Sequence, residues 1–450
     1  ASTLRKRVAR KVRAEHYPAP YAIIDLWQHH AGTSEQAYIA EAHSIARLMV
    51  GETARNLVRV FLLQDRLKGL GKKAAADFRH VHVIGAGTMG GDIAAWCAYK
   101  GLEVTLQDRE QRFIDPALER AKKFYEKKIP DQKKAEQTRA RLRSDLNGEG
   151  IASADVVVEA IIEDADAKES LYRNIEPKMQ PDALLATNTS SIRLETLEQA
   201  LANTNRFAGL HFFNPVAKMP LIEVIHTETT AQSATDRALA FARRIDKLPV
   251  PVKSSPGFLV NRILMPYLME ALEAAGEGIP PEAIDKAATR FGMPMGPVEL
   301  ADTVGLDICL SVGKILAQAY GKPVPRQLED KVKAKQLGRK SGQGFYRYHD
   351  GKPVKEADKA KQATDDLTDR LIMPMLNEAV ACLREGIVAD ADLLDAGVIF
   401  GAGFAPFRGG PIQYIRNAGP KQLLERLQAL QSRYGDRFKP DAGWNSGILF

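Results

Sequence analysis

The chain has 450 residues, of which 45% are hydrophobic and 26% are charged. This composition excludes a disordered, collagen-like or low-complexity protein, and a length of about 150 residues per domain suggests roughly three domains. Lys and Arg exceed Asp and Glu by 63 to 56, a formal net charge of +7. So mild an excess suits a polyanionic small molecule as well as nucleic acid. No apolar run approaches the roughly 20 residues of a membrane helix, so we expect no transmembrane segment.

The three cysteines, Cys97, Cys309 and Cys382, lie far apart and lack the spacing of a zinc site. We therefore expect neither a disulfide framework nor a bound metal. An odd number of separate thiols is typical of a reducing, intracellular location, and we predict a cytoplasmic protein of the bacterial cytosol.

Residues 1–80 are expected to form a helical connector with no chemistry of its own. Residues 1–13 carry six basic side chains and no acidic one. This pattern fits an organelle transit peptide or the solvated end of a linker, and we favour the linker. Thr33-x-x-Gln36 is a capping-box pattern that predicts a helix towards residue 50, and a second helix is expected over 52–68.

A dinucleotide-binding pattern begins at residue 81. Val81–Ile84 predicts a buried strand that leads into three glycines spaced as in the Gly-x-Gly-x-x-Gly motif, namely Gly85, Gly87 and Gly90. A helix is expected over 92–99 and a second strand over 103–107. In this motif the glycines permit a tight turn, a close approach of backbone to pyrophosphate, and packing of helix on strand. A glycine-rich turn without a ligand is the alternative.

Asp108 ends the second strand and follows Gly85 by 23 residues. A carboxylate at this distance suits the ribose hydroxyls and disfavours the extra phosphate of NADP. The sequence therefore predicts NAD as the cofactor.

Residues 111–147 are predicted to be helical and strongly basic, with a break at Pro130. Solvated helix faces are the interpretation we favour. A basic hairpin that meets an anionic substrate tail is the functional alternative. We expect no nucleic-acid partner, because aromatic residues do not interleave the later charges.

Four further segments have the pattern of buried strands: 155–162, 183–187, 207–213 and 221–226. The first is continuously apolar, as in a parallel sheet covered on both faces. Ligands of such sheets lie outside the carboxyl ends of the strands.

Four polar residues fall at or beyond these strands and form the candidate catalytic cluster: Ser190, His211, Glu223 and Asn261. Pro215 breaks the chain after His211, so the last two strands can be neighbours. Glu223 can then hydrogen-bond one ring nitrogen of His211 and stabilise its protonated form. A satisfied core histidine is the alternative interpretation. Ser190 and Asn261 can donate hydrogen bonds to a developing carbonyl oxygen.

The sequence resembles the 3-hydroxyacyl-CoA dehydrogenase family, and within it the dehydrogenase half of multifunctional β-oxidation proteins that also carry an enoyl-CoA hydratase. The segments that carry the resemblance are VIGAGTMGGDIA, VVVEAIIE, TNTSSI, GLHFFNPVAKMPLIEVI, SSPGFLVNRI and GMPMGPVEL. They span most of residues 81–450. The resemblance implies an α/β fold with a Rossmann-type NAD-binding domain over 81–255, followed by two tandem all-α domains over 256–350 and 351–450.

The resemblance also implies roles for single residues. His211 matches the catalytic histidine, Glu223 its carboxylate partner, and Ser190 and Asn261 the residues that hold the substrate. The positions that match the cofactor site are Gly85, Gly87, Met89, Gly90, Asp108, Glu163, Lys168, Asn188 and Asn214.

An internal repeat with an offset of 108 residues relates 262–279 to 370–387. Asp369 in the second copy stands where the first has Asn261. We expect the second copy to pack on the first as a built-in partner, which gives a monomer with an internal pseudo-dimer. Tyr414, in the second copy, is either a lining residue of an acyl or CoA channel or a core tyrosine.

The predicted function is NAD-dependent oxidation of (S)-3-hydroxyacyl-CoA to 3-ketoacyl-CoA in fatty-acid β-oxidation. The expected partners are the acyl-CoA thioester and a hydratase domain or thiolase subunit. One alternative is another two-domain NAD-dependent 3-hydroxyacid dehydrogenase, which would use a lysine near the substrate. The other is a non-catalytic docking scaffold for a β-oxidation complex.

Overall fold

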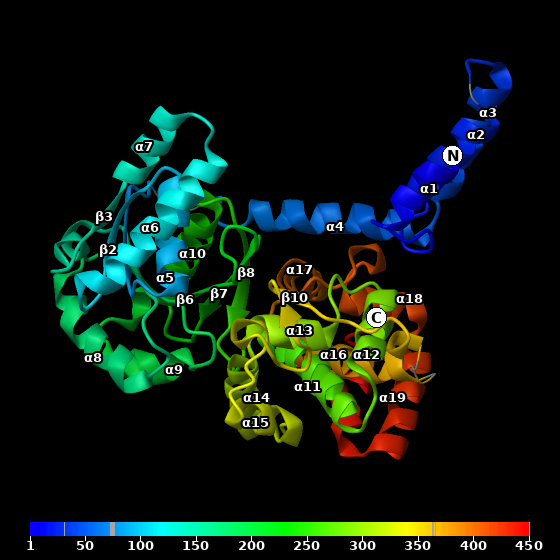
Figure 1. Ribbon diagram of the computed structural model, residues 1–450. Helices are drawn as coiled ribbons and strands as arrows, with labels where there is room; N and C mark the ends of the chain where they lie inside the picture. Colours follow the sequence, from blue (N-terminus) through cyan, green and yellow to red (C-terminus); the bar gives the residue numbers. More distant parts are fainter. Residues whose placement is uncertain (31, 73–76, 362–363, 365, 450) are drawn as a thin grey trace.

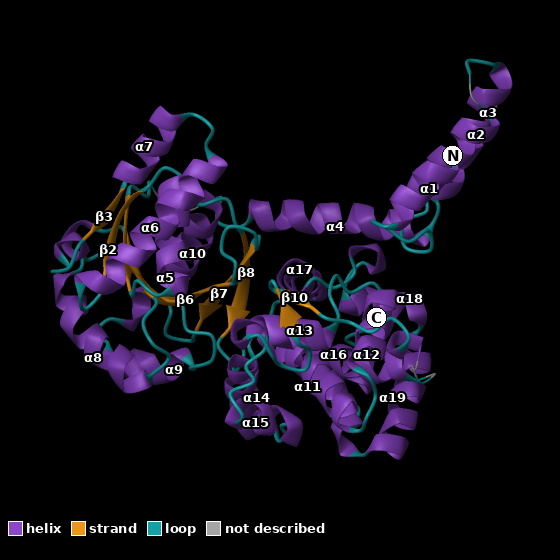
Figure 2. Cartoon of the chain, in the orientation of Figure 1, coloured by secondary structure: helices purple, strands orange, loops and turns teal. Residues whose placement is uncertain are grey.

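A computed structural model describes residues 1–30, 32–72, 77–361, 364 and 366–449 (Figure 1). Along the chain, N-terminal helices lead into a sheet flanked by helices, and a helical region follows (Figure 2). In the part of the chain that is described, no helix is long and apolar enough to cross a membrane.

The N-terminal helices form an arm of the molecule. They are α1 (Ser2–Ala9), α2 (Ala19–His29), α3 (Glu35–Met49) and α4 (Glu52–Gly69). The first three project away from the rest, and α4 runs from them to the sheet along the helical region, where it contacts α17, residues Ala391–Ala402 (Figure 1). The predicted capping box is wrong by one residue, because the hydroxyl of Ser34, not Thr33, accepts the N–H of Ala37 at 3.2 Å.

The sheet has eight strands in the order β3-β2-β1-β4-β5-β6-β7-β8. Their bounds are β1 His80–Ile84, β2 Glu103–Gln107, β3 Leu142–Ser144, β4 Val156–Glu159, β5 Leu184–Thr187, β6 Phe207–Phe212, β7 Leu221–His226 and β8 Leu248–Lys253. All neighbours are parallel except β6 and β7. The order reverses between β1 and β4, which is the switch point where such sheets bind dinucleotides.

Helices cover both faces of this sheet. They are α5 (Thr88–Tyr99), α6 (Gln111–Lys128), α7 (Gln132–Ala140), α8 (Ala165–Ile175), α9 (Leu194–Leu197) and α10 (Gln232–Arg244). Val156 and Val158 pack with α5 and α10, whereas Val157 between them packs with α8 and α9. Successive strand residues point to opposite faces, so a strand covered on both faces is apolar throughout.

The structure corrects three predicted elements. The strand expected over 155–162 ends at Glu159, because the backbone of Ala160 packs against the glycine turn after β1. The helix expected over 92–99 begins at Thr88, where the glycines of the first turn conceal the helical pattern. The segment 111–147 is not helical throughout, since its end forms β3 beside β2.

The helical region contains nine α-helices among the described residues. They are α11 (Val260–Gly276), α12 (Pro281–Phe291), α13 (Pro297–Val304), α14 (Leu306–Tyr320), α15 (Arg326–Lys333), α16 (Leu367–Arg384), α17 (Ala391–Ala402), α18 (Pro411–Ala418) and α19 (Pro420–Tyr434). A short two-stranded sheet, β9 (Tyr348–His349) with β10 (Lys352–Pro353), lies between α15 and α16.

Equivalent residues of the sequence repeat make reciprocal contacts between α11 and α16. Arg262 is paired with Glu378 at 2.7 Å, and Arg370 is paired with Glu270 at 2.5 Å. The guanidinium of Arg262 also lies over the Tyr320 ring at 4.2 Å, as that of Arg370 lies over the Tyr434 ring at 4.1 Å. Both arginines are buried, so the charges are removed from water only in paired form.

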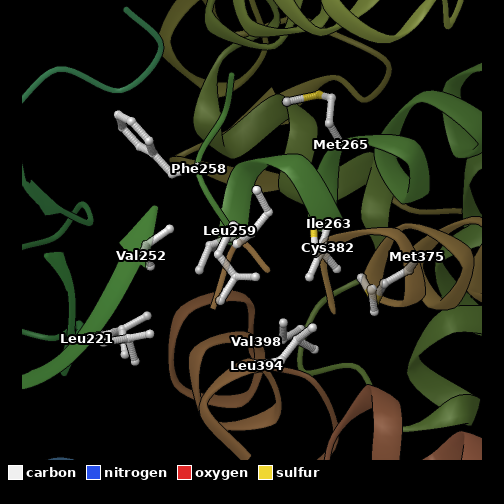
Figure 3. Close-up of a cluster of buried hydrophobic side chains, with 14 of the residues drawn as sticks. Leu221, Val252, Phe258, Leu259, Ile263, Met265, Met375, Cys382, Leu394 and Val398 are labelled. Atoms are coloured by element: carbon white, nitrogen blue, oxygen red, sulfur yellow. The ribbon is translucent and has the colours of Figure 1, made fainter. Parts of the chain in front are cut away.

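One hydrophobic cluster joins the edge of the sheet to the helical region (Figure 3). Leu221 and Val252, on β7 and β8, face Leu259 at the start of α11, and Val398 of α17 closes the cluster below. The two parts of the molecule therefore share a core at the place where the candidate cluster lies.

Candidate active site

The glycine turn has the backbone geometry that the motif requires. Gly85 has φ +104°, and a Cβ on it would lie 2.4 Å from the carbonyl oxygen of Ala160. A Cβ on Gly90 would lie 1.8 Å from the carbonyl oxygen of Gly85. Gly87 has open space around it and directly precedes α5. Met89, in the first turn of that helix, is half-buried. The turn thus presents accessible backbone at a helix N-terminus, which attracts phosphate groups.

Asp108 follows β2 and stabilises this turn. Its Oδ2 accepts the N–H of Ala86 at 2.7 Å, and its Oδ1 accepts the N–H of Arg109 at 2.7 Å. A carboxylate has about four acceptor positions, so each oxygen can also accept a ribose hydroxyl. Sequence reasoning predicted this residue for the ribose, but not its second contact with the turn.

His211 and Glu223 are directly opposite each other on the antiparallel pair β6–β7. Nδ1 of His211 lies 2.6 Å from Oε2 of Glu223, and both side chains are buried. No described residue hydrogen-bonds to Nε2 of His211, which leaves this nitrogen able to exchange a proton with a ligand. Because β6 is parallel to β5, β4 and β1, His211 lies near the same edge of the sheet as the glycine turn.

The other oxygen of Glu223 binds the start of the helical region. Oε1 accepts the N–H groups of Leu259 and Val260 at 2.9 and 2.8 Å. Phe258, just before them, has φ +52° and packs its ring 5.6 Å from that of His211. The sequence does not predict that the Phe258 ring lies beside His211, because the left-handed backbone conformation of Phe258 is visible only in the structure.

Ser190 lies in a loop, Thr189–Ser191, that is organised by Glu163. Oε1 of Glu163 accepts the hydroxyl of Thr189 at 2.6 Å and the N–H groups of Ser190 and Ser191 at 2.9 and 3.0 Å. Burial alone would raise the pKa of Glu163, but the Lys168 ammonium and these donors outweigh burial and lower it. The amide of Asn261 donates to the carbonyl oxygen of Ser190 at 3.4 Å, which brings the two predicted substrate residues together.

Asn188 and Asn214 lie along the same edge of the sheet. Oδ1 of Asn188 accepts the N–H of Phe212 at 3.0 Å and so ties β5 to β6. Asn214 is exposed and precedes Pro215 through a cis peptide bond. The ammonium of Lys247 holds the next turn, donating to the carbonyl oxygens of Val216 and Met219.

Lys168 is almost completely buried, unlike Asp108 and Glu163, the other charged residues predicted for the cofactor site. Its ammonium is 2.6 Å from Oε1 of Glu159 and 3.6 Å from Oε2 of Glu163. Glu159 is a buried carboxylate that sequence reasoning did not select, although a lone glutamate at the end of an apolar strand is a signal for one.

Tyr414 is the one predicted residue that the structure places in other surroundings. Its ring packs edge-on against Phe291, with 5.3 Å between the centroids, and the guanidinium of Arg408 lies 5.1 Å from it. These contacts belong to the packing of α12 and α18, so a channel role for Tyr414 stays a prediction. Among the described residues, no group of three or more His, Cys, Asp or Glu side chains is arranged to hold a metal ion.

A doubly covered parallel sheet with a glycine turn at its switch point and a buried His–Glu pair at the same edge defines a dinucleotide-binding class of protein. Residues 80–255 match the family described as 3-hydroxyacyl-CoA dehydrogenase, NAD binding domain, and residues 257–348 match the C-terminal domain of that family. The chain belongs to the 3-hydroxyacyl-CoA dehydrogenase family.

Individual relatives agree with this assignment. A fatty acid oxidation complex subunit alpha from Psychrobacter cryohalolentis is 36% identical over 94% of this chain, which spans 62% of that relative's length. The crystal structure of 3-hydroxybutyryl-CoA dehydrogenase from Escherichia coli superimposes with a TM-score of 0.74 at 26% identity, covering 83% of this chain and 99% of that one. The crystal structure of (S)-3-hydroxybutyryl-CoA dehydrogenase from Ralstonia eutropha superimposes with a TM-score of 0.57 at 34% identity. The match covers 61% of this chain and 100% of that one.

Proposed function

We propose that this chain oxidises (S)-3-hydroxyacyl-CoA to 3-ketoacyl-CoA with NAD, as a step of fatty-acid β-oxidation. The observation that carries the proposal is the buried contact of 2.6 Å between Nδ1 of His211 and Glu223. This contact lies at the sheet edge that also bears the glycine turn. When bound, NAD supplies the acceptor for the hydride that leaves C3 of the substrate.

The residues of the first two strands fit a dinucleotide. Gly87 leaves open space beside the N-terminus of α5, and Gly90 could not carry a side chain without striking Gly85. Asp108 has acceptor capacity left for ribose hydroxyls and would repel an added phosphate. These features support NAD over NADP.

His211 is the proposed general base. Glu223 accepts a hydrogen bond from the N–H at Nδ1, which keeps the proton on that nitrogen and leaves Nε2 unprotonated and able to remove the proton of the 3-hydroxyl group. The carboxylate then stabilises the imidazolium that forms. The hydroxyl of Ser190 and the amide of Asn261 are proposed to hold the C3 oxygen as it becomes a carbonyl.

The alternatives fit the site less well. A dehydrogenase of free 3-hydroxyacids that uses a lysine needs an accessible ammonium group. Lys168, the lysine of the site, is instead buried against Glu159. A non-catalytic docking scaffold would have no need of a buried and oriented His–Glu pair.

The test is turnover of acetoacetyl-CoA with NADH by the wild-type chain, with free acetoacetate as the comparison. We expect the thioester to be strongly preferred. His211→Ala should lower kcat by about 10²- to 10⁴-fold with unchanged NADH affinity. His226→Ala changes a histidine outside the cluster and is the matched control. Equal turnover by the His211 variant and the wild type would refute the assignment of the base.

We also propose that the helical region consists of two tandem, mainly helical domains, over 256–350 and 351–450, that follow a Rossmann domain over 81–255. They are not all-α as expected, because the small sheet of β9 and β10 spans their boundary. The reciprocal pairs Arg262–Glu378 and Arg370–Glu270 support an internal pseudo-dimer. Because the similar relative is a fatty acid oxidation complex subunit, a hydratase domain or a thiolase subunit is the proposed partner. Three buried free cysteines favour a reducing compartment, for which we propose the bacterial cytoplasm.

A further inference from the structure

The loop between β6 and β7, residues 213–220, carries two groups of the proposed site. Its first residue, Phe213, packs against His211, with 4.6 Å between the centroids of the two rings. The next residue, Asn214, is exposed and is one of the predicted cofactor contacts. Val216 is the one fully buried side chain of the loop. The loop therefore has little core packing of its own, and its position depends on other contacts.

Lys247, just before β8, supplies most of these contacts. Its ammonium donates to the carbonyl oxygens of Val216 and Met219, the latter at 2.7 Å. The backbone N–H of the next residue, Leu248, donates to the carbonyl oxygen of Pro220 at 2.8 Å. The second half of the loop is therefore attached by hydrogen bonds to the start of β8.

The same ammonium lies against α5, the helix that follows the glycine turn. It stands 4.2 Å from the centroid of the Trp96 ring, and an aromatic face attracts a cation. The indole N–H of Trp96 donates to the carbonyl oxygen of Ile245 at 2.8 Å. Residues 245–247 thus connect α5, whose N-terminus lies beside the open space at Gly87, with the loop that bears Asn214.

Lys247 is buried without a carboxylate partner. Its neighbour Asp246 pairs instead with Lys100, at 2.8 Å, and no described carboxylate forms a salt bridge with Lys247. Removal of an ammonium group from water is unfavourable, and a methionine of similar length would avoid this cost. The contribution of Lys247 therefore lies in its N–H donors, which reach two carbonyl groups and an aromatic face from one point.

We propose that Lys247 is a positioning residue of the cofactor site, which attaches the loop of Phe213 and Asn214 to α5. This attachment keeps Asn214 and the ring beside His211 at a fixed place relative to the glycine turn. The inference rests on the proposed function, in that His211 is taken as the base and Asn214 as a contact of NAD. A misplacement of about 1 Å at such groups can lower turnover by up to about 10²-fold.

The decisive experiment compares Lys247→Met with the wild type. The variant keeps the apolar stem of the side chain and removes the donors to the loop. NADH affinity, measured by fluorescence, should fall about tenfold, because the loop is no longer held in its binding position. The kcat for acetoacetyl-CoA at saturating NADH should also fall about tenfold. The KM for acetoacetyl-CoA should stay within about threefold, because Ser190 and Asn261 lie outside the loop.

Tyr125→Phe is the matched control. The hydroxyl of Tyr125 is a buried donor to the carbonyl oxygen of Ala95 on α5, at 3.0 Å. Its loss weakens the same helix without a change at the loop, so the melting temperature should fall while NADH affinity and kcat stay unchanged. Lys247→Gln, which keeps an NH₂ donor on a shorter side chain, is the second variant. It should lose NADH affinity to a smaller extent than Lys247→Met, and it carries the test if Lys247→Met does not fold.

Hydrogen exchange supplies a readout that does not depend on activity. The N–H groups of Lys218 and Met219 both donate to the carbonyl oxygen of Pro215 within the loop. Because the loop is released when its anchor is removed, we expect these two N–H groups to exchange faster in Lys247→Met than in the wild type. Tyr125→Phe should leave their exchange unchanged.

Three results would overturn the proposal. The first is unchanged NADH affinity or unchanged loop exchange in the Lys247 variant that folds. The second is an equal loss of NADH affinity in Tyr125→Phe. The third is an equal rise in the KM for acetoacetyl-CoA, because it would show a general loosening of the fold. A wild-type chain inactive on thioesters would refute the proposed function alone, since NADH binding and hydrogen exchange would still test the role of Lys247.

Discussion

Glu223 lies 2.6 Å from Nδ1 of His211 through one carboxylate oxygen and accepts two backbone N–H groups at the start of α11 through the other. One side chain therefore sets both the orientation of the histidine and the position of the helix that bears Asn261. Glu223 therefore fixes the position of His211, the proposed base, relative to that of Asn261, one of the proposed oxygen-binding groups, although the two residues lie in different parts of the fold.

Glu223→Gln preserves the shape of the side chain, but its single amide oxygen can satisfy only one of the two contacts. The amide would place its NH₂ group either against the N–H groups of Leu259 and Val260 or against Nδ1 of His211, where it would force the wrong tautomer. We expect kcat to fall by about 10²-fold or more, and the free energy of unfolding by about 1–3 kcal/mol. Steady-state kinetics and urea unfolding measure the two effects, and a variant that retains wild-type kcat would contradict this role.

Asp108 should determine which cofactor is used. The wild type is expected to favour NADH over NADPH in kcat/KM, because the carboxylate repels the extra phosphate. Asp108→Ser should narrow this preference and also weaken NADH binding, since the variant loses an ionised acceptor at the N–H of Ala86. Kinetics with both cofactors test the prediction, and a wild type that uses NADPH equally well would argue against it.

Lys247 predicts a pH dependence of stability. Burial lowers the pKa of Lys247 to about 8, and the nearby Lys100 ammonium adds to this effect. In the unfolded chain the pKa of Lys247 is about 10.4. Between about pH 8 and this value the unfolded chain therefore binds more protons than the folded protein. The free energy of unfolding consequently rises with pH over this range. The gain should approach about 3 kcal/mol across this window.

The measurement is urea unfolding from about pH 7.5 to about pH 10, with Lys247→Met as the reference that removes this group. Relative to the variant, the wild type should become more stable as pH rises. A difference that is constant or shrinks over this range would mean that Lys247 stays charged in the folded protein.

Arg370 should contribute strongly to the packing of α11 on α16. Arg370→Met leaves the buried carboxylate of Glu270 with Arg437 as its remaining partner, at 2.7 Å. We expect the free energy of unfolding to fall by about 3–5 kcal/mol. Arg433→Met is the control, because Arg433 forms an exposed pair with Asp366 and its loss should cost less than about 1 kcal/mol. Equal effects of the two substitutions would contradict a structural role for the buried pair.

Much of this fold could be predicted because local patterns and tertiary packing agree. The apolar run at Val156–Val158 and the glycines after β1 indicate a parallel sheet and its turn, and His211 and Glu223 are opposite each other as expected. Two edge strands show no such pattern. The strand pattern of β3 is hidden because charged Arg141 and Arg143 flank Leu142. The strand pattern of β8 is hidden by Pro249 and Pro251, because proline is rare in strands except at the edge of a sheet.

The polar network beneath the Ser190 loop could not be derived from sequence. Resemblance to the family selected Glu163 and Lys168, but only the packing of α8 against β4 and β5 shows that Lys168 is buried on Glu159. Contacts of this kind join residues from separate elements. Neither the spacing nor the periodicity of residues in the sequence shows which of them are in contact in the fold.

The reciprocal pairing of α11 with α16 occurs within one polypeptide. The two helices are therefore always present in equal amounts, and dilution does not separate them as it can separate the subunits of a dimer. A mutation in a symmetric homodimer changes both halves of the contact at once. Here each side can change alone, and Asn261 and Asp369 already differ at equivalent positions. A substitution on one side therefore need not be accompanied by the same substitution on the other.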